Sequence, residues 1–295
     1  MDHSQDFTAL VLAAQRPGVV NPLAQSFGVS HKCLVPICNA PLIVHVIETL
    51  SRTAGVARIR ISVEPEIWDR IDALVAPYRR SDLVIDLVAP SPSLADSVCD
   101  ALEGQDGPFV ITTADNVLLT PDAVSALVRT LSQKDVAAVL TTREAVQAVN
   151  VHAQRRFYRM AGRHYSNCNL YGMRDGAGLG AAEIFRQGGQ FRRNVGRAVH
   201  AFGLLNILLA IAGLLSVDGA ARRLSRRFGL RFAGLVLDDG ALAIDVDNAR
   251  THAIAREVLA ARIAQRGDPA CQTAFKRDPR SASKRDPFSD MMLVC

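Results

Sequence analysis

The first half of the chain alternates between short apolar runs and amphipathic segments. The apolar runs are rich in Val, Ile, Leu and Ala, as is typical of parallel strands buried on both faces. The segments between them carry apolar residues at helical spacing. We expect strands at 8–14, 56–63, 83–89, 108–115 and 136–142, and helices at 41–53, 65–78, 93–104 and 121–133. This rhythm predicts an α/β fold with a Rossmann-like, doubly wound, mostly parallel sheet.

The pattern changes after residue 142. Residues 157–174 are expected to form extended segments with turns, and a helical pattern returns from about residue 179. In 231–246, Asp-Asp-Gly separates two apolar runs, which predicts a small β-hairpin. A helix at 248–266 is expected to close the domain.

The chain of 295 residues is long enough for one large α/β domain. We expect this domain to span 1–266, with an apolar and Arg-rich helical insertion at 190–230. Residues 267–295 are polar and contain KRDP twice, which predicts a disordered basic tail.

The positive charge lies in two places. The formal net charge is +5, and segment 276–288 together with the arginines at 222, 223, 226 and 227 accounts for more than all of it. The body of the domain is therefore not expected to bind nucleic acid. The six cysteines show no metal-ligand spacing, which favours free thiols in a reducing cytoplasm.

The loop after the first strand carries the first candidate chemistry. In 11-VLAAQRPGVVNPLAQSFGVSHKC-33 an apolar run opens into a loop with Arg16 and Gly18, and Lys32 follows. A nucleoside triphosphate carries about four negative charges, which cations and backbone N–H groups can stabilise. Gly18 would let the backbone approach a phosphate closely. The pattern indicates a phosphate-binding loop; the alternative is a surface loop with two solvated cations.

Acidic residues near strand ends are the second candidate. Asp115 ends a strand at the edge where ligands bind in such sheets, and a carboxylate there suits Mg²⁺. It could instead cap the following turn. Asp245 and Asp247 lie two apart in 244-IDVDN-248. Asp247 or Asn248 could also be the N-cap of the closing helix, and spacing alone does not decide.

Four segments in order carry a family resemblance. They are 32-KCLVPICNAPLI-43, 109-FVITTADNVLLTPDAV-124, 165-YSNCNLYGMR-174 and 244-IDVDNARTHAIAREVL-259. Over roughly residues 8–262 the chain resembles the MobA-like nucleotidyltransferases, a family that includes molybdenum-cofactor guanylyltransferase, methylerythritol-phosphate cytidylyltransferase and sugar-1-phosphate nucleotidylyltransferases. The resemblance implies a glycosyltransferase-A-like nucleotidyltransferase fold. It also implies transfer of a nucleoside monophosphate from an NTP to a phosphorylated acceptor, with release of pyrophosphate.

The resemblance also implies roles for individual residues. Arg16 and Lys32 would be catalytic contacts to the phosphates, and Asp115 and Asp247 would hold Mg²⁺. Asn169 would touch the acceptor. The residues implied to bind the nucleotide are Leu12, Ala13, Ala14, Gln15, Gly18, Ser93 and Ser97. Segment 91-SPSLADSVCDAL-102 is similar to the Ser-Asp-Ser-Val helix entry of cytidylyltransferases and favours CTP over GTP and UTP, although serines at helix starts are also common caps.

Two departures from the family pattern leave other functions open. Ala14 and Gln15 stand where the family usually has glycine, and Ala249, Arg250 and Thr251 replace the closing Pro-Glu-Asp. One alternative is therefore a catalytically inactive relative that acts as a nucleotide- or membrane-associated interaction protein. Another is a metal-dependent glycosyltransferase, which would be expected to carry Asp-x-Asp where this chain has Thr-Ala-Asp-Asn.

Residues 201–217 form a nearly uninterrupted apolar run between arginine-rich segments. The run is at the lower limit for a membrane span, and a crossing helix would place Asn169 and Asp247 on opposite sides of the membrane. Two interpretations remain. One is a buried helix or an oligomer interface. The other is peripheral contact of residues 192–227 with an anionic membrane, in which case the acceptor could be a lipid headgroup.

Overall fold

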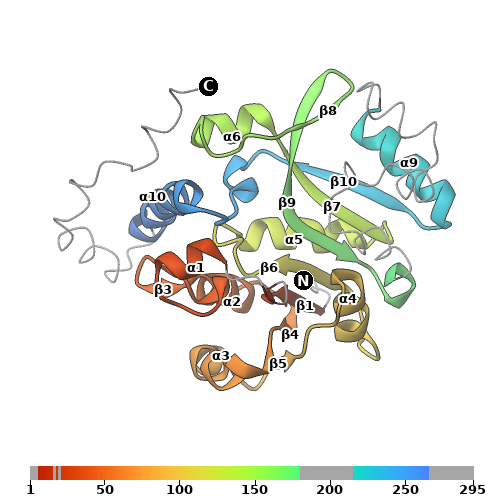
Figure 1. Cartoon of the computed structure of the whole chain (residues 1–295). Helices are drawn as coiled ribbons and strands as arrows, with labels where there is room; N and C mark the ends of the chain where they lie inside the picture. Colours follow the sequence, from red (N-terminus) through yellow and green to blue (C-terminus); the bar gives the residue numbers. More distant parts are fainter. Residues whose placement is uncertain (1–5, 16–17, 19–20, 180–214, 266–295) are drawn as a thin grey trace.

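The computed structural model describes residues 6–15, 18, 21–179 and 215–265. Its centre is one eight-stranded sheet in the order β10-β7-β9-β6-β1-β4-β5, with β8 paired to β9 (Figure 1). The strands of this sheet are β1 (Phe7–Leu12), β4 (Val56–Ser62), β5 (Val84–Val88), β6 (Phe109–Thr113), β7 (Val136–Thr142), β8 (Tyr158–Met160), β9 (Arg163–Met173) and β10 (Phe232–Leu237). β9 runs antiparallel to its neighbours β6 and β7. The other pairs along this order are parallel: β10 with β7, β6 with β1, β1 with β4, and β4 with β5. The predicted mostly parallel sheet is confirmed.

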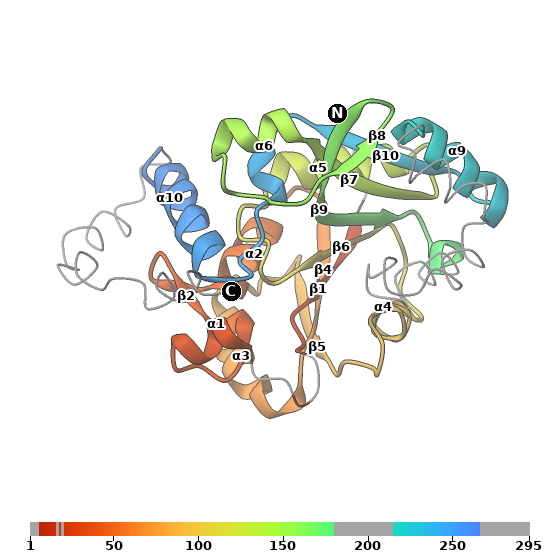
Figure 2. The same cartoon turned by 45° about the horizontal axis from the view of Figure 1, so that its top comes forward.

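Helices cover both faces of the sheet (Figure 2). The α-helices within the described residues are α1 (Pro22–Ser26), α2 (Leu42–Ser51), α3 (Trp68–Val75), α4 (Leu94–Leu102), α5 (Pro121–Leu131), α6 (Arg143–Val149), α9 (Val217–Phe228) and α10 (Ala249–Gln265). α2, α3 and α5 bury their apolar sides in one core cluster, whereas α4 and α9 pack into a second cluster. The doubly wound arrangement follows from these two clusters, because each strand must bury apolar side chains on both faces.

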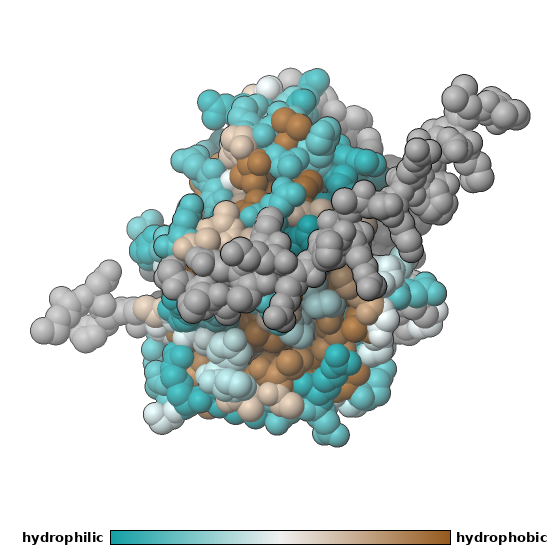
Figure 3. All heavy atoms as spheres, turned by 90° about the vertical axis from the view of Figure 1, so that its left-hand side faces the viewer, coloured by the Kyte–Doolittle hydropathy of each residue, from teal (hydrophilic) through white to brown (hydrophobic). Residues whose placement is uncertain are grey.

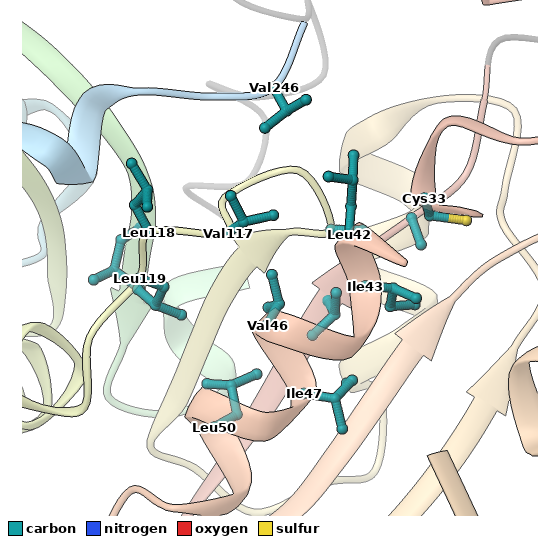
Figure 4. Close-up of a cluster of buried hydrophobic side chains, with 14 of the residues drawn as sticks. Cys33, Leu42, Ile43, Val46, Ile47, Leu50, Val117, Leu118, Leu119 and Val246 are labelled. Atoms are coloured by element: carbon teal, nitrogen blue, oxygen red, sulfur yellow. The ribbon is translucent and has the colours of Figure 1, made fainter. Parts of the chain in front are cut away.

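The larger cluster fixes the loop after β6. On α2, Leu42, Ile43, Val46, Ile47 and Leu50 recur at helical spacing and are fully buried. They lie close to the apolar loop 117–119 and to Val246 (Figure 4). Aliphatic packing therefore holds the segments that follow β6 and precede α10, and both of these segments carry acidic residues.

The hairpin predicted at 231–246 is wrong. β10 pairs in parallel with β7, and residues Gly240–Ala243 form a 3₁₀ helix capped by the Asp239 carboxylate. A Cβ at Gly240 would lie 2.1 Å from the backbone oxygen of Ala145, so the glycine allows close packing on α6. Antiparallel hairpins are found elsewhere: in the short pair β2 (Pro36–Ile37) and β3 (Ala40–Pro41), and in β8–β9 within the predicted extended region 157–174.

Part of the predicted insertion can be described. Residues 217–228 form α9, whereas 190–214 and the predicted tail lie outside the described residues. Among the residues that the structure describes, no helix has the length and apolar character needed to cross a bilayer.

Candidate active site

Three charged side chains from distant parts of the chain meet at the carboxyl edge of the sheet. Lys32 opens the 3₁₀ helix Lys32–Leu34, Asp115 lies just after β6, and Asp247 lies just before α10. The Lys32 ammonium forms ion pairs with a carboxylate oxygen of Asp115 and, at 2.6 Å, with Oδ1 of Asp247. The Lys32 and Asp115 side chains are mostly buried, and the Asp247 side chain is 64% exposed. These three predicted site residues therefore lie together.

Lys32 is held in its charged form. Burial alone would lower the pKa of Lys32, but the carboxylates of Asp115 and Asp247 outweigh burial and raise the pKa above its usual value. Lys32 therefore stays positively charged at every pH near neutrality.

The same two carboxylates suit a divalent cation. An oxygen of Asp115 and an oxygen of Asp247 already converge on one cationic group, and the Thr113 hydroxyl donates a 2.5 Å hydrogen bond to the other oxygen of Asp115. Within the described part of the chain, no group of three His, Cys, Asp or Glu side chains is arranged to hold a metal. Mg²⁺ often binds through one or two carboxylates plus substrate phosphates and water, so this donor set fits Mg²⁺.

Asp245 adds a third carboxylate beside this pair. Its Oδ2 accepts a 2.7 Å hydrogen bond from Asn169 Nδ2, and its buried Oδ1 has no hydrogen-bond partner among the described residues. Burial, and then the charges of Asp115 and Asp247, raise the pKa of Asp245 well above its ordinary value. A buried acid without full hydrogen bonding destabilises the fold, which is typical of functional sites.

Asn169 sits at a break in strand pairing. The register between β7 and β9 shifts at residues 138–140, and Asn169 adopts a left-handed φ of 45° there. Its Oδ1 accepts a 2.8 Å hydrogen bond from Asn167 Nδ2, while its Nδ2 donates to Asp245. The two bonds fix the orientation of the amide, since only the oxygen can accept and only the nitrogen can donate. Contact of Asn169 with an acceptor stays a prediction.

Gln15 stands where the family that the sequence resembles usually has glycine, and its side chain organises the opening loop. Its Nε2 donates to the Ser30 carbonyl at 3.1 Å, and its Oε1 accepts from the Lys32 backbone N–H at 3.3 Å. The backbone N–H of Gln15 donates to Glu64 at 2.6 Å. Sequence reasoning missed Glu64, although it follows a buried strand as Asp115 does. Gln15 therefore links the end of β1 to the segment that carries Lys32.

The other predicted nucleotide contacts fall at the same edge or on α4. Leu12 and Ala13 lie at the end of β1, Ala14 is exposed, and Gly18 is exposed with a φ of 72°. Arg16 lies outside the described residues. On α4, the Ser93 hydroxyl accepts from the Asp96 backbone N–H at 3.1 Å, and the buried Ser97 hydroxyl accepts from the Ser91 N–H at 2.8 Å. Both serines thus cap and brace this helix start.

A pocket of about 300 Å³ lies away from these charges, between α2 and α10. His45 and Glu48 line it on α2, Arg262 lines it on α10, and Lys32, Asp115 and Asp247 do not border it. Figure 3 views the molecule from the side that carries α10 and shows apolar and hydrophilic residues intermixed on that face. Because Lys32, Asp115 and Asp247 lie at the sheet edge and not around this pocket, we take the sheet edge as the candidate active site.

Comparison with protein-family models gives a match that covers much of the chain. A family model described as MobA-like NTP transferase domain matches residues 9–175, more than half of the chain. That match contains Lys32, Asp115 and Asn169, and ends before Asp245 and Asp247. No curated protein sequence matches the chain significantly.

Solved structures share the fold at low sequence identity. A hypothetical transferase from Thermus thermophilus superposes with a TM-score of 0.66 at 22% identity, covering 84% of this chain and 100% of the other. A 4-diphosphocytidyl-2C-methyl-D-erythritol synthase from Anaerococcus prevotii gives 0.55 at 10% identity, over 87% and 96%. A CMP:2-keto-3-deoxy-manno-octonic acid synthetase complexed with CTP gives 0.52 at 15% identity, over 87% and 100%.

Proposed function

Because the chain belongs to the MobA-like NTP transferase domain family, we propose that it transfers a nucleoside monophosphate from an NTP to a phosphorylated acceptor. The observation that carries this proposal is the meeting of Lys32, Asp115 and Asp247 at the carboxyl edge of the sheet. Ligands of doubly wound sheets bind at this edge.

The reaction needs charge stabilisation more than proton transfer. An oxygen of the acceptor phosphate attacks the α-phosphorus, a new phosphoanhydride bond forms, and the bond to the bridging oxygen of the β-phosphate breaks. Pyrophosphate leaves with that electron pair. The acceptor phosphate is already ionised near neutral pH, so no general base is required. Lys32 places a fixed positive charge beside the reacting phosphates, and Arg16 is proposed to add a second one.

Asp115 and Asp247 would hold Mg²⁺, which when bound neutralises charge on the nucleotide phosphates. Asn169 would face the acceptor. Its amide oxygen is already used by Asn167, so its remaining N–H is the group left to donate to an acceptor oxygen.

CTP is the favoured nucleotide. The segment 91–102 resembles the helix entry of cytidylyltransferases, and two structures with this fold carry cytidyl or CMP chemistry in their names. Ser93 and Ser97 would bind the nucleotide beside their capping role. Because those structures share at most 15% identity with this chain, GTP and UTP belong in the same experiment.

The experiment measures pyrophosphate release from CTP, GTP, UTP and ATP with Mg²⁺ and a panel of sugar phosphates, polyol phosphates and phosphorylated lipid headgroups. We expect release with one nucleotide and one acceptor class. Lys32→Ala is expected to lower the rate at least about 100-fold, because one electrostatic contact to the transition state is lost. Lys134→Ala, in the connection between α5 and β7, is the matched control. Absence of release with every pair, or normal turnover in Lys32→Ala, would refute the proposal.

A further inference from the structure

The chain between α6 and the end of β9 is basic and free of acids. Residues 145–174 contain no Asp or Glu, whereas arginines stand at 155, 156, 159, 163 and 174. Arg174 forms an ion pair with Asp135, but the side chains at 155, 156, 159 and 163 are exposed around the β8–β9 hairpin. The hairpin therefore presents concentrated positive charge to solvent.

Three of these arginines have no acidic partner in the described part of the chain. Arg155, Arg156 and Arg163 form no ion pair with any residue that the structure describes. The same stretch of chain carries two exposed apolar side chains: Val151 and Tyr158 are each 62% exposed. Arginines together with exposed apolar side chains suit a partner that is both anionic and apolar.

α9 extends the same basic character. β8 and α9 lie side by side in both ribbon views (Figures 1 and 2). α9 packs its apolar side, including Val217 and the buried Ala221, towards β10 and the second core cluster. Arg222 and Arg226, one helical turn apart, are exposed. In sequence, the apolar run 201–217 leads directly into this helix.

We propose that the hairpin surface, defined as Val151, Arg155, Arg156, Tyr158 and Arg163, docks on an anionic lipid bilayer. The guanidinium groups meet lipid phosphates, while Tyr158 and Val151 enter the boundary between headgroups and acyl chains. A nucleic acid would pair with the arginines but offers little to Val151, so the bilayer fits better. This inference does not depend on the proposed enzymatic function.

The experiment is co-sedimentation of the full chain with vesicles. The vesicles consist of phosphatidylcholine, either alone or with about 30% phosphatidylglycerol, and binding is measured at about physiological salt. A single-stranded oligonucleotide serves as competitor. The test variant is Arg155→Glu/Arg156→Glu/Arg163→Glu. The control variant is Arg70→Glu/Arg129→Glu/Arg256→Glu, which makes the same charge change at exposed positions on α3, α5 and α10. Thermal unfolding of each variant establishes that it is folded.

We expect binding to the anionic vesicles only, and weaker binding in high salt. The test variant should bind at least about 100-fold more weakly, since each basic residue near an anionic membrane contributes appreciably to binding. The control should lose much less, and Val151→Ser/Tyr158→Ala should lose about tenfold through reduced apolar burial. No binding by the wild type, equal losses in test and control variants, or preferential binding to the oligonucleotide would each overturn the proposal. Pyrophosphate release in solution is expected to be the same in test variant and wild type.

Discussion

Two charge clusters at opposite ends of the sheet show what separates a site from a structural ion pair. At the carboxyl edge, one cation (Lys32) lies between two carboxylates, and the carboxylate of Asp245 stands nearby. At the amino edge, one carboxylate (Asp135) lies between two guanidinium groups, those of Arg174 and Arg231.

The two clusters differ in how completely their charges and hydrogen-bonding atoms are paired. Asp135 accepts hydrogen bonds from the backbone N–H of Arg231 at 2.7 Å and from the Arg231 side chain, and it forms an ion pair with Arg174. Its own side chain is 10% exposed. The carboxyl-edge cluster has an excess of negative charge, and Oδ1 of Asp245 has no hydrogen-bond partner in the described part of the chain. The amino-edge cluster around Asp135 stabilises the fold as it stands. The carboxyl-edge cluster around Lys32 is suited to binding additional cationic charge.

The largest expected effect separates activity from stability at the carboxyl edge. Asp115→Asn keeps the side-chain shape but removes one of three carboxylates. We expect pyrophosphate release to fall at least about 100-fold, because the charge facing the phosphates and their cation is lost. The free energy of unfolding, measured with urea, should stay within about 1 kcal/mol of the wild type. A parallel loss of several kcal/mol would show that this cluster is structural after all.

The opposite result is expected at the amino edge. Asp135→Asn should lower the free energy of unfolding by about 2 kcal/mol at pH 7, because three charge-assisted hydrogen bonds weaken, and should leave pyrophosphate release unchanged. Asp106→Asn, at an exposed position, is the control and should change neither quantity.

The pH dependence sharpens this prediction. Hydrogen bonds from the Arg231 side chain and backbone lower the pKa of Asp135 to about 2, below its unfolded value. The stabilisation is therefore complete above the unfolded pKa and is lost as pH falls towards the folded pKa. The difference between wild type and Asp135→Asn should shrink to about half by pH 3. A difference independent of pH would exclude a role for the charge.

The smallest effect concerns Asp245. Because its pKa is raised, the ionised form is disfavoured in the folded state, and stability falls as pH rises above the unfolded pKa. Asp245→Asn should therefore raise the melting temperature by about 2–4 °C at pH 7, with a smaller gain at pH 4. The acceptor KM should rise, because the group that orients the Asn169 amide changes from a carboxyl to an amide. An unchanged melting temperature would indicate that water satisfies Asp245.

Sequence reasoning recovered the elements that depend on local pattern. The expected strands and helices of the first half are all found, since apolar periodicity and caps such as Thr120 before Pro121 act within a few residues. The error at Asp238–Gly240 arose because Asp-Asp-Gly also suits a capped 3₁₀ turn. What decides between the two is the contact of Gly240 with Ala145, which is distant in the chain.

The sequence predicted only part of the candidate site, because the remaining contacts join residues that are distant in the chain. Lys32, Asp115 and Asp247 follow from motif order, and the structure brings them together. Spacing could not show that Asp245 turns towards Asn169, or that Gln15 ties Lys32 to the end of β1. These contacts depend on the bulge in β9 and on the path of a loop, which no local pattern specifies.

β9 joins the two clusters. It carries Asn169, which contacts Asp245, and it leads into Arg174, which pairs with Asp135. Inserting or deleting one residue in this strand would reverse the direction of every side chain beyond that point. Such a change would disconnect Asn169 from Asp245 or Arg174 from Asp135. We therefore expect that β9 tolerates no change in length, even at positions where it tolerates a change of residue.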